Sequence, residues 1–189
     1  MSSSSTTLPA LAVIETASIA RGFVVADAGL KRAVVTVKHA RAVTPGKFIF
    51  IFGGGVEATE EAINAARVAA GSDIIDELYL PGAHAALWPA IDGAVVPAAG
   101  DAVAIVETTG VAAAIAAADV ALKAVDVSVS PLRLAIGVGG KGWFTLAGAL
   151  GDVEAAIDAV RATAKPDRVV AIELIAQPHA ELRGFLSST

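Results

Sequence analysis

The chain has 189 residues, carries a formal net charge of −5 and contains no cysteine. This length suits one large domain or two small ones, and the acidic balance argues against nucleic-acid binding, which needs clustered lysine and arginine. The lack of cysteine excludes disulfides, thiolate metal sites and a cysteine nucleophile. Residues of the set AVILMFWYC make up 55% of the chain. Short domains cannot bury so much apolar surface, so we expect part of it to lie between subunits.

The N-terminal segment is rich in serine and threonine, and we expect residues 1–9 to form a disordered tail. It has neither the positive charge nor the following apolar core of a signal peptide. No apolar run reaches the roughly 18 uncharged residues that a membrane span needs, so the sequence predicts no such span.

The first half of the chain alternates strand and helix patterns. Apolar and β-branched runs predict strands, amphipathic stretches predict helices, and a Gly-containing segment predicts a turn. The predicted order is strand, helix, strand, strand, helix, strand, and then a short helix near His84. The corresponding ranges are 11–14, 18–33, 34–43, 48–52, 57–70 and 74–80.

The second half of the chain repeats the first at a nearly constant offset. Ordered matches of charged, glycine and histidine residues are not explained by an alanine-rich composition, so we infer a duplication. Residues 91–100 are predicted to link the two copies. The repeated residues are Glu15-Thr16 with Glu107-Thr108, Gly46-Lys47 with Gly140-Lys141, and His84 with His179. The second copy's predicted elements span 103–106, 110–125, 126–136, 143–147, 152–164 and 168–176, followed by a short helix near His179.

This doubled order predicts the fold class. A β-α-β-β-α-β unit is the split βαβ pattern, in which one antiparallel sheet carries helices on one face. We therefore expect an α+β protein of two tandem ferredoxin-like domains, residues 10–92 and 101–189.

Several charged residues recur in both copies. On the first helix of each copy an aspartate stands four residues before a lysine, a spacing that allows the two to pair on one helix face. We expect the recurring acids to be charges on helix faces or at strand ends. These residues are Asp27 with Lys31, Asp119 with Lys123, and the acids Glu15 and Glu107.

Several segments resemble a known family. AVIETASIARGFVVADAGLKRA and AIVETTGVAAAIAAADVALKAV are similar to the opening of the bacterial microcompartment shell domain, and IAQPHAEL is similar to its closing segment. TPGKFIFIFGG and AIGVGGKGWFTLAG resemble the propanediol-utilisation type most. The resemblance extends from Leu11 to Leu186 and includes two unpermuted domains, as in the tandem-domain shell proteins.

The resemblance implies a role in assembly. In that family a tandem-domain chain forms a trimer that mimics a hexamer, and trimers tile with other shell proteins into a sheet that encloses enzymes in the bacterial cytoplasm. The resemblance therefore implies a structural shell protein rather than an enzyme, with a central pore for small metabolites. It implies no cofactor, no resident metal, and neither nucleic acid nor membrane as a partner.

The resemblance also assigns roles to individual residues. The turn between the second and third strands of each copy would line the pore, where small residues let six loops approach one axis. The next residue of each turn is a lysine, which would attract anions if it faced the channel and would otherwise be a solvated flank residue. The pore residues would be Thr44, Pro45, Gly46, Val138, Gly139 and Gly140, flanked by Lys47 and Lys141, with Lys31 and Lys123 at the tile edges.

The chain departs from its nearest relatives at two points. Thr44 stands where they carry a cysteine that holds an iron–sulfur cluster in the pore, and threonine supplies no thiolate. We therefore expect an open or water-filled pore without a cluster. Gln177 replaces an edge arginine, so edge contacts should differ in detail.

Other motifs of the chain do not point to a cofactor or catalytic site. Residues 137–142 fit GxGxxG, but a predicted strand follows instead of the helix that a dinucleotide fingerprint requires. Residues 53–55 precede a helix, where a tight turn is favoured over an anion cradle. His84 and His179 fit capping or packing groups better than catalysts. The alternative function is a soluble ligand-binding or regulatory oligomer built from tandem ferredoxin-like domains.

Overall fold

The computed structural model describes residues 8–96 and 99–188 of the chain. The first copy forms an antiparallel sheet of four strands in the order β2-β3-β1-β4. This is the strand order of a ferredoxin-like unit, and it confirms the predicted fold class. The elements of this copy are β1 (Ala10–Thr16), α1 (Ile19–Arg32), β2 (Thr36–Val43), β3 (Lys47–Gly54), α2 (Val56–Ala70), a 3-10 turn (Gly71–Asp73) and β4 (Ile74–Leu80).

Helix α1 begins where the sequence predicted it. The Ser18 side chain accepts a hydrogen bond from the backbone N–H of Arg21 at 3.2 Å, which satisfies one of the free donors of the first turn. The buried stripe of the helix is made of small and β-branched residues, so α1 packs closely against α2 and the sheet. That stripe consists of Gly22, Val25, Ala26 and Gly29.

The second copy repeats the same topology. Its sheet has the order β6-β8-β5-β9, and β7 also pairs with β8. Helix α6 follows β9, as the short helix near His179 was predicted to do. Its elements are β5 (Ala102–Thr108), α4 (Val111–Ala124), β6 (Ser128–Val129), β7 (Arg133–Leu134), β8 (Gly142–Gly148), α5 (Leu150–Thr163), a 3-10 turn (Pro166–Arg168), β9 (Val169–Ala176) and α6 (Ala180–Ser188).

The predicted strand over 126–136 is wrong in its extent. Only the two-residue strands β6 and β7 form there, and both pair with β8. Pro131 separates them and has no N–H to donate to a ladder. The Ser130 hydroxyl instead accepts from the N–H of Thr145, and Ala135 ends β7 with a positive φ of 65°.

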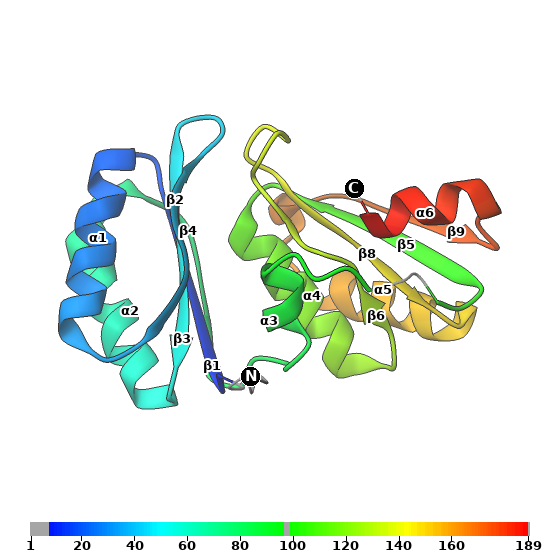
Figure 1. Cartoon of the computed structure of the whole chain (residues 1–189), viewed down its shortest axis with the longest axis horizontal. Helices are drawn as coiled ribbons and strands as arrows, with labels where there is room; N and C mark the ends of the chain where they lie inside the picture. Colours follow the sequence, from blue (N-terminus) through cyan, green and yellow to red (C-terminus); the bar gives the residue numbers. More distant parts are fainter. Residues whose placement is uncertain (1–7, 97–98, 189) are drawn as a thin grey trace, which may run out of the picture.

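The first sheet is covered on both faces. Helices α1 and α2 lie on one face, and α4 of the second copy lies on the other (Figure 1). The phenylalanines of β3 point into the core with α1 and α2, whereas Leu11, Val13, Ile49 and Ile51 belong to a core shared with the second copy. The two copies therefore fold against each other through a continuous apolar interface.

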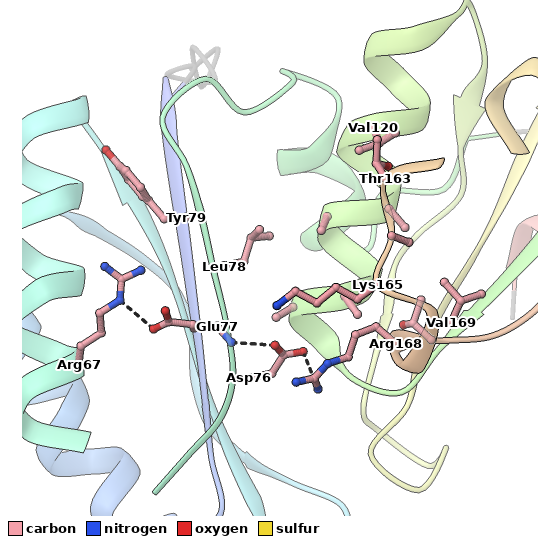
Figure 2. A pocket seen from close by; sticks show the side chains of 16 residues that line it. Arg67, Asp76, Glu77, Leu78, Tyr79, Val120, Thr163, Lys165, Arg168 and Val169 are labelled. Atoms are coloured by element: carbon pink, nitrogen blue, oxygen red, sulfur yellow. Dashed lines mark hydrogen bonds and ion pairs between the residues drawn. The ribbon is translucent and has the colours of Figure 1, made fainter. Parts of the chain in front are cut away.

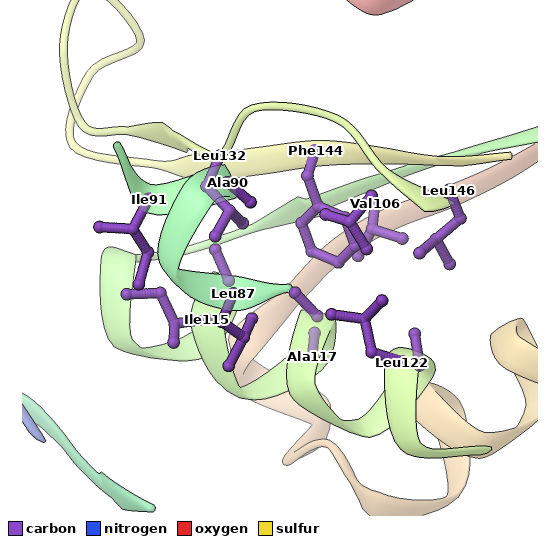
Figure 3. Close-up of a cluster of buried hydrophobic side chains, with 14 of the residues drawn as sticks. Leu87, Ala90, Ile91, Val106, Ile115, Ala117, Leu122, Leu132, Phe144 and Leu146 are labelled. Atoms are coloured by element: carbon purple, nitrogen blue, oxygen red, sulfur yellow. The ribbon is translucent and has the colours of Figure 1, made fainter. Parts of the chain in front are cut away.

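The short helix α3 (Leu87–Ile91) lies between the copies. Figure 3 shows Leu87 and Ile91 packed beside Ile115 of α4. The Trp88 indole N–H donates to the Leu8 carbonyl at 2.9 Å. Of the tail expected over residues 1–9, residues 1–7 lie outside the described residues.

Candidate functional site

The first predicted pore turn connects β2 to β3. It consists of Thr44, Pro45 and Gly46, all exposed. The N–H of Gly46 donates to the Val43 carbonyl at 2.9 Å, and Gly46 has a φ of 107°. Glycine adopts this left-handed conformation at little cost, so the chain reverses here within three residues.

The second predicted pore turn connects β7 to β8 and is longer. Its closing bond joins the Ala135 N–H to the Lys141 carbonyl at 3.0 Å. Gly137, Gly139 and Gly140 all have positive φ values, which explains why this turn is so rich in glycine.

The two turns lie side by side at one end of the molecule (Figure 1). A Cβ atom added to Gly140 would lie 2.9 Å from Pro45 Cδ and 3.0 Å from the Thr44 carbonyl oxygen. This contact is tighter than side chains allow, so only glycine lets the second turn approach the first so closely. The sequence placed these turns at equivalent positions of the two copies, and the fold brings them together.

The lysines that follow the two turns face carboxylates of their own sheets. Lys141 Nζ lies 2.6 Å from Glu107 Oε1, and Lys47 Nζ lies 3.8 Å from Glu15 Oε2. The same lysine–glutamate pair therefore stands at the base of each turn. Both lysines are partly exposed, and each has a glutamate partner within its own sheet.

Glu15 is a charged residue whose side chain is buried where the two copies meet. Its side chain is fully buried, and Oε1 accepts a hydrogen bond at 2.8 Å from the N–H of Ala112 in the first turn of α4. Its other oxygen, Oε2, has no hydrogen-bond partner within the described residues. Burial raises the pKa of the Glu15 carboxyl above 4.5, although the Ala112 N–H and the Lys47 ammonium oppose the shift. Glu15 thus joins the first sheet to the second copy.

This raised pKa predicts a pH dependence of stability. As pH rises through 4.5, the unfolded chain releases the Glu15 proton while the folded chain still holds it, so folding becomes less favourable until the raised pKa is passed. Glu15→Gln keeps an acceptor for Ala112 but cannot ionise. We expect the stability of the unmodified protein relative to this variant to fall as the pH rises above 4.5, until the raised pKa of Glu15 is passed, in denaturant titrations. A constant or rising difference would contradict the assignment.

The aspartate–lysine pairs predicted on the first helix of each copy are confirmed. Lys31 Nζ lies 2.6 Å from Asp27 Oδ2 on the exposed face of α1, and Lys123 pairs with Asp119 on α4. Asp119 is buried, however, and its second oxygen accepts at 2.8 Å from the N–H of His84 in the first copy. Glu15 lies near the end of β1 and Asp119 lies on α4, but both side chains are buried and connect the two copies.

A cavity of about 320 Å³ lies between the copies, bounded by β4, the start of α4 and the end of α5. Figure 2 shows Asp76 turned toward Arg168 and Glu77 turned toward Arg67. Arg168 Nη1 lies 3.3 Å from Asp76 Oδ2, and Arg67 Nε lies 2.8 Å from Glu77 Oε2. The Arg168–Asp76 pair joins the second copy to the first, whereas the Arg67–Glu77 pair lies within the first copy beside the cavity.

The other glycine motifs have structural roles. The GxGxxG match at 137–142 leads into β8 and not into a helix, so it lacks the helix N-terminus that would hold a pyrophosphate. Gly53 and Gly54 end β3, and Gly55 is the N-cap of α2, which is the tight strand-to-helix turn that the sequence favoured. Among the described residues, no group of three or more His, Cys, Asp or Glu side chains could hold a metal ion, and no helix could cross a membrane.

The chain contains two β-α-β-β-α-β units, and the β2–β3 turn of the first unit contacts the β7–β8 turn of the second. This arrangement defines a tandem-domain protein. The sequence profile of the BMC domain matches residues 10–83 and 102–178, and the chain belongs to this bacterial microcompartment domain family. It is 38% identical over 174 residues to the bacterial microcompartment shell protein PduT of Citrobacter freundii, a match that covers 92% of this chain and 95% of that protein.

Solved structures show the same architecture. A microcompartment protein from Desulfitobacterium hafniense DCB superposes with a TM-score of 0.84 at 33% identity, covering 94% of this chain and 99% of that one. The fused permuted hexameric shell protein MSM0275 from the RMM microcompartment superposes with a TM-score of 0.62 at 26% identity. The match covers 81% of this chain and 82% of the MSM0275 chain. The relatives are structural shell proteins, as the resemblance implied.

Proposed function

We propose that this chain is a structural shell protein of a bacterial microcompartment. Three copies form a ring of six domains that tiles with other shell proteins, and small metabolites pass through a pore on the ring axis. The observation that carries the proposal is the contact between Gly140 and the Thr44–Pro45 turn, because it gathers equivalent turns of both copies at one end of the molecule.

The pore is lined in this proposal by Thr44, Pro45 and Gly46 and by the turn of residues 138–140. Hydroxyl, N–H and carbonyl groups of these residues give a small polar opening. Lys47 and Lys141 lie just behind the turns but each faces a glutamate. Their charge is therefore largely neutralised, and we propose that the opening discriminates by size and by backbone hydrogen bonding more than by net charge.

The protein has no catalytic role in this proposal. The buried acid Glu15 joins the two copies, and four charged residues of the cavity form two ion pairs, Arg67 with Glu77 and Arg168 with Asp76. Lys31 and Lys123 lie at the tile edges in the proposal, and both are exposed enough to reach a neighbouring tile.

Solution mass and electron microscopy test the proposal together. We expect a species of about three times 18.8 kDa, and flat sheets, tubes or hexagonally outlined particles at high concentration. A density map viewed down the threefold axis should place both turns at the axis. Stable monomers, or discrete particles that bind a nucleotide or amino acid tightly, would instead favour the ligand-binding alternative.

A further inference from the structure

The cavity between the two copies, about 320 Å³ in volume, has an apolar wall and a charged end. We propose that it binds a short-chain aliphatic carboxylate, with the hydrocarbon tail against the wall and the carboxylate at the charged end. A volume of this size is at the lower end of the range for small-molecule sites. The cavity lies within one chain, so the site does not depend on the trimer proposed above.

The apolar wall belongs to helix α4. Ala113, Ala116 and Val120 line the cavity and are partly exposed, whereas most residues of this helix are buried. Their spacing of three and four residues places them on one helix face, and Figure 2 shows Leu78 of β4 turned toward that helix. Alanine side chains are short, so the space between α4 and β4 stays open. A hydrocarbon chain placed there would remove apolar surface from water on both sides.

The charged end of the cavity has one cation more than it has acids. Arg67 pairs with Glu77 and Arg168 pairs with Asp76, while Lys165 has no ion pair within the described residues. Because both acids are already bound to arginines, they repel an anion only weakly. The remaining charge of Lys165 favours a ligand with a single negative charge, and an amine would find no free acid of the cavity to pair with.

The free edge of β4 adds a backbone donor at the same place. β4 is the last strand of its sheet, so every second N–H and carbonyl group points away from β1. Arg168 Nη2 donates to the Ile75 carbonyl at 3.5 Å, which shows that this edge faces the second copy. Tyr79 lies four residues further along and lines the cavity, so its N–H points to the same side. Figure 2 shows Lys165 extending toward this strand, so a carboxylate between them would accept from both.

A ligand in this cavity would connect the two copies. β4 belongs to the first copy, and α4 and Lys165 belong to the second. A ligand that binds only the folded chain stabilises it by mass action. Occupancy of the site would therefore make the contact between copies depend on the concentration of the carboxylate.

Methyl NMR tests the site, with sodium hexanoate as the probe. The Leu78 and Val120 methyl signals should shift in a saturable way, whereas those of Val68, which is 85% exposed on α2, should not. Affinity should rise about fourfold per methylene group from butyrate to hexanoate, as the burial of hydrocarbon predicts. Hexylamine should bind at least about tenfold more weakly, because it lacks the charge that Lys165 attracts. Unchanged Leu78 and Val120 signals, or equal binding of hexylamine, would overturn the proposal.

Two matched substitutions locate the carboxylate. Lys165→Gln should weaken hexanoate binding about tenfold, since the ligand loses a charged donor. Arg161→Gln removes the same charge from an exposed position of α5 that does not line the cavity, and it should leave binding unchanged. Equal losses from the two substitutions would show that hexanoate responds to the general charge of the surface, which would overturn the site.

A third substitution, Ala116→Leu, tests the apolar wall. The larger side chain would occupy the space of the tail and should abolish hexanoate binding, while circular dichroism should show an intact fold. Undiminished affinity in the folded variant would place the ligand elsewhere and overturn the proposal. Such a result would leave the shell function standing, because that function rests on the contact between the two turns and not on the cavity.

Discussion

Replacing Glu15 with alanine is expected to lower the free energy of unfolding by about 3 kcal/mol, because it leaves a buried donor and a partly buried ammonium without their acceptor. The donor is the N–H of Ala112, which lies 2.8 Å from Glu15 Oε1, and the ammonium is that of Lys47. Since the carboxylate lies between the first sheet and α4, the loss should separate the two copies before either unfolds. Denaturant titration followed by circular dichroism measures the change.

Glu77→Ala is the control for Glu15→Ala, because it removes an acid from an ion pair that is exposed rather than buried. Glu77 also pairs with a cation, Arg67 at 2.8 Å, but its side chain is 37% exposed. An exposed pair of this kind contributes less than about 1 kcal/mol. Equal losses from the two alanine substitutions would show that the burial of Glu15 has no special effect on stability.

Gly53→Ala is expected to destabilise the first copy by about 3 kcal/mol, at the upper end of the effects of overpacking. A Cβ atom at Gly53 would lie 2.4 Å from the Ala10 carbonyl oxygen and 2.4 Å from Trp88 Cη2. The carbonyl belongs to the backbone of the neighbouring strand, so β1 and β3 would have to separate. Trp88 would move too, which would loosen α3 between the copies. The free energy of unfolding and the trimer mass should both fall.

Gly151→Ala is the control for this substitution. Gly151 lies in α5, and a Cβ atom there would meet nothing within 4 Å. Alanine forms helix better than glycine, so stability should stay constant or rise by up to about 1 kcal/mol. A loss of under about 1 kcal/mol for Gly53→Ala would mean that the two strands adjust to the added methyl group.

Local patterns predicted most of the elements correctly. Ser18 marks the start of α1, and the range 74–80 was predicted as the strand that forms β4. These signals are local, since a cap or an alternating run depends only on neighbouring residues. The same approach was wrong over residues 126–136, where β-branched residues suggested one long strand but Pro131 and the turn at Ala135 divide it.

The sequence by itself determined the duplication, the β-α-β-β-α-β order and the equivalence of the two small-residue turns, because these are properties of order along the chain. Only the tertiary structure decided which equivalent residues are buried. Glu15 and Glu107 occupy matching positions in similar strands, yet one lies beneath α4 and the other borders an open hollow. The physical reason is that burial depends on what packs across a surface from distant parts of the chain.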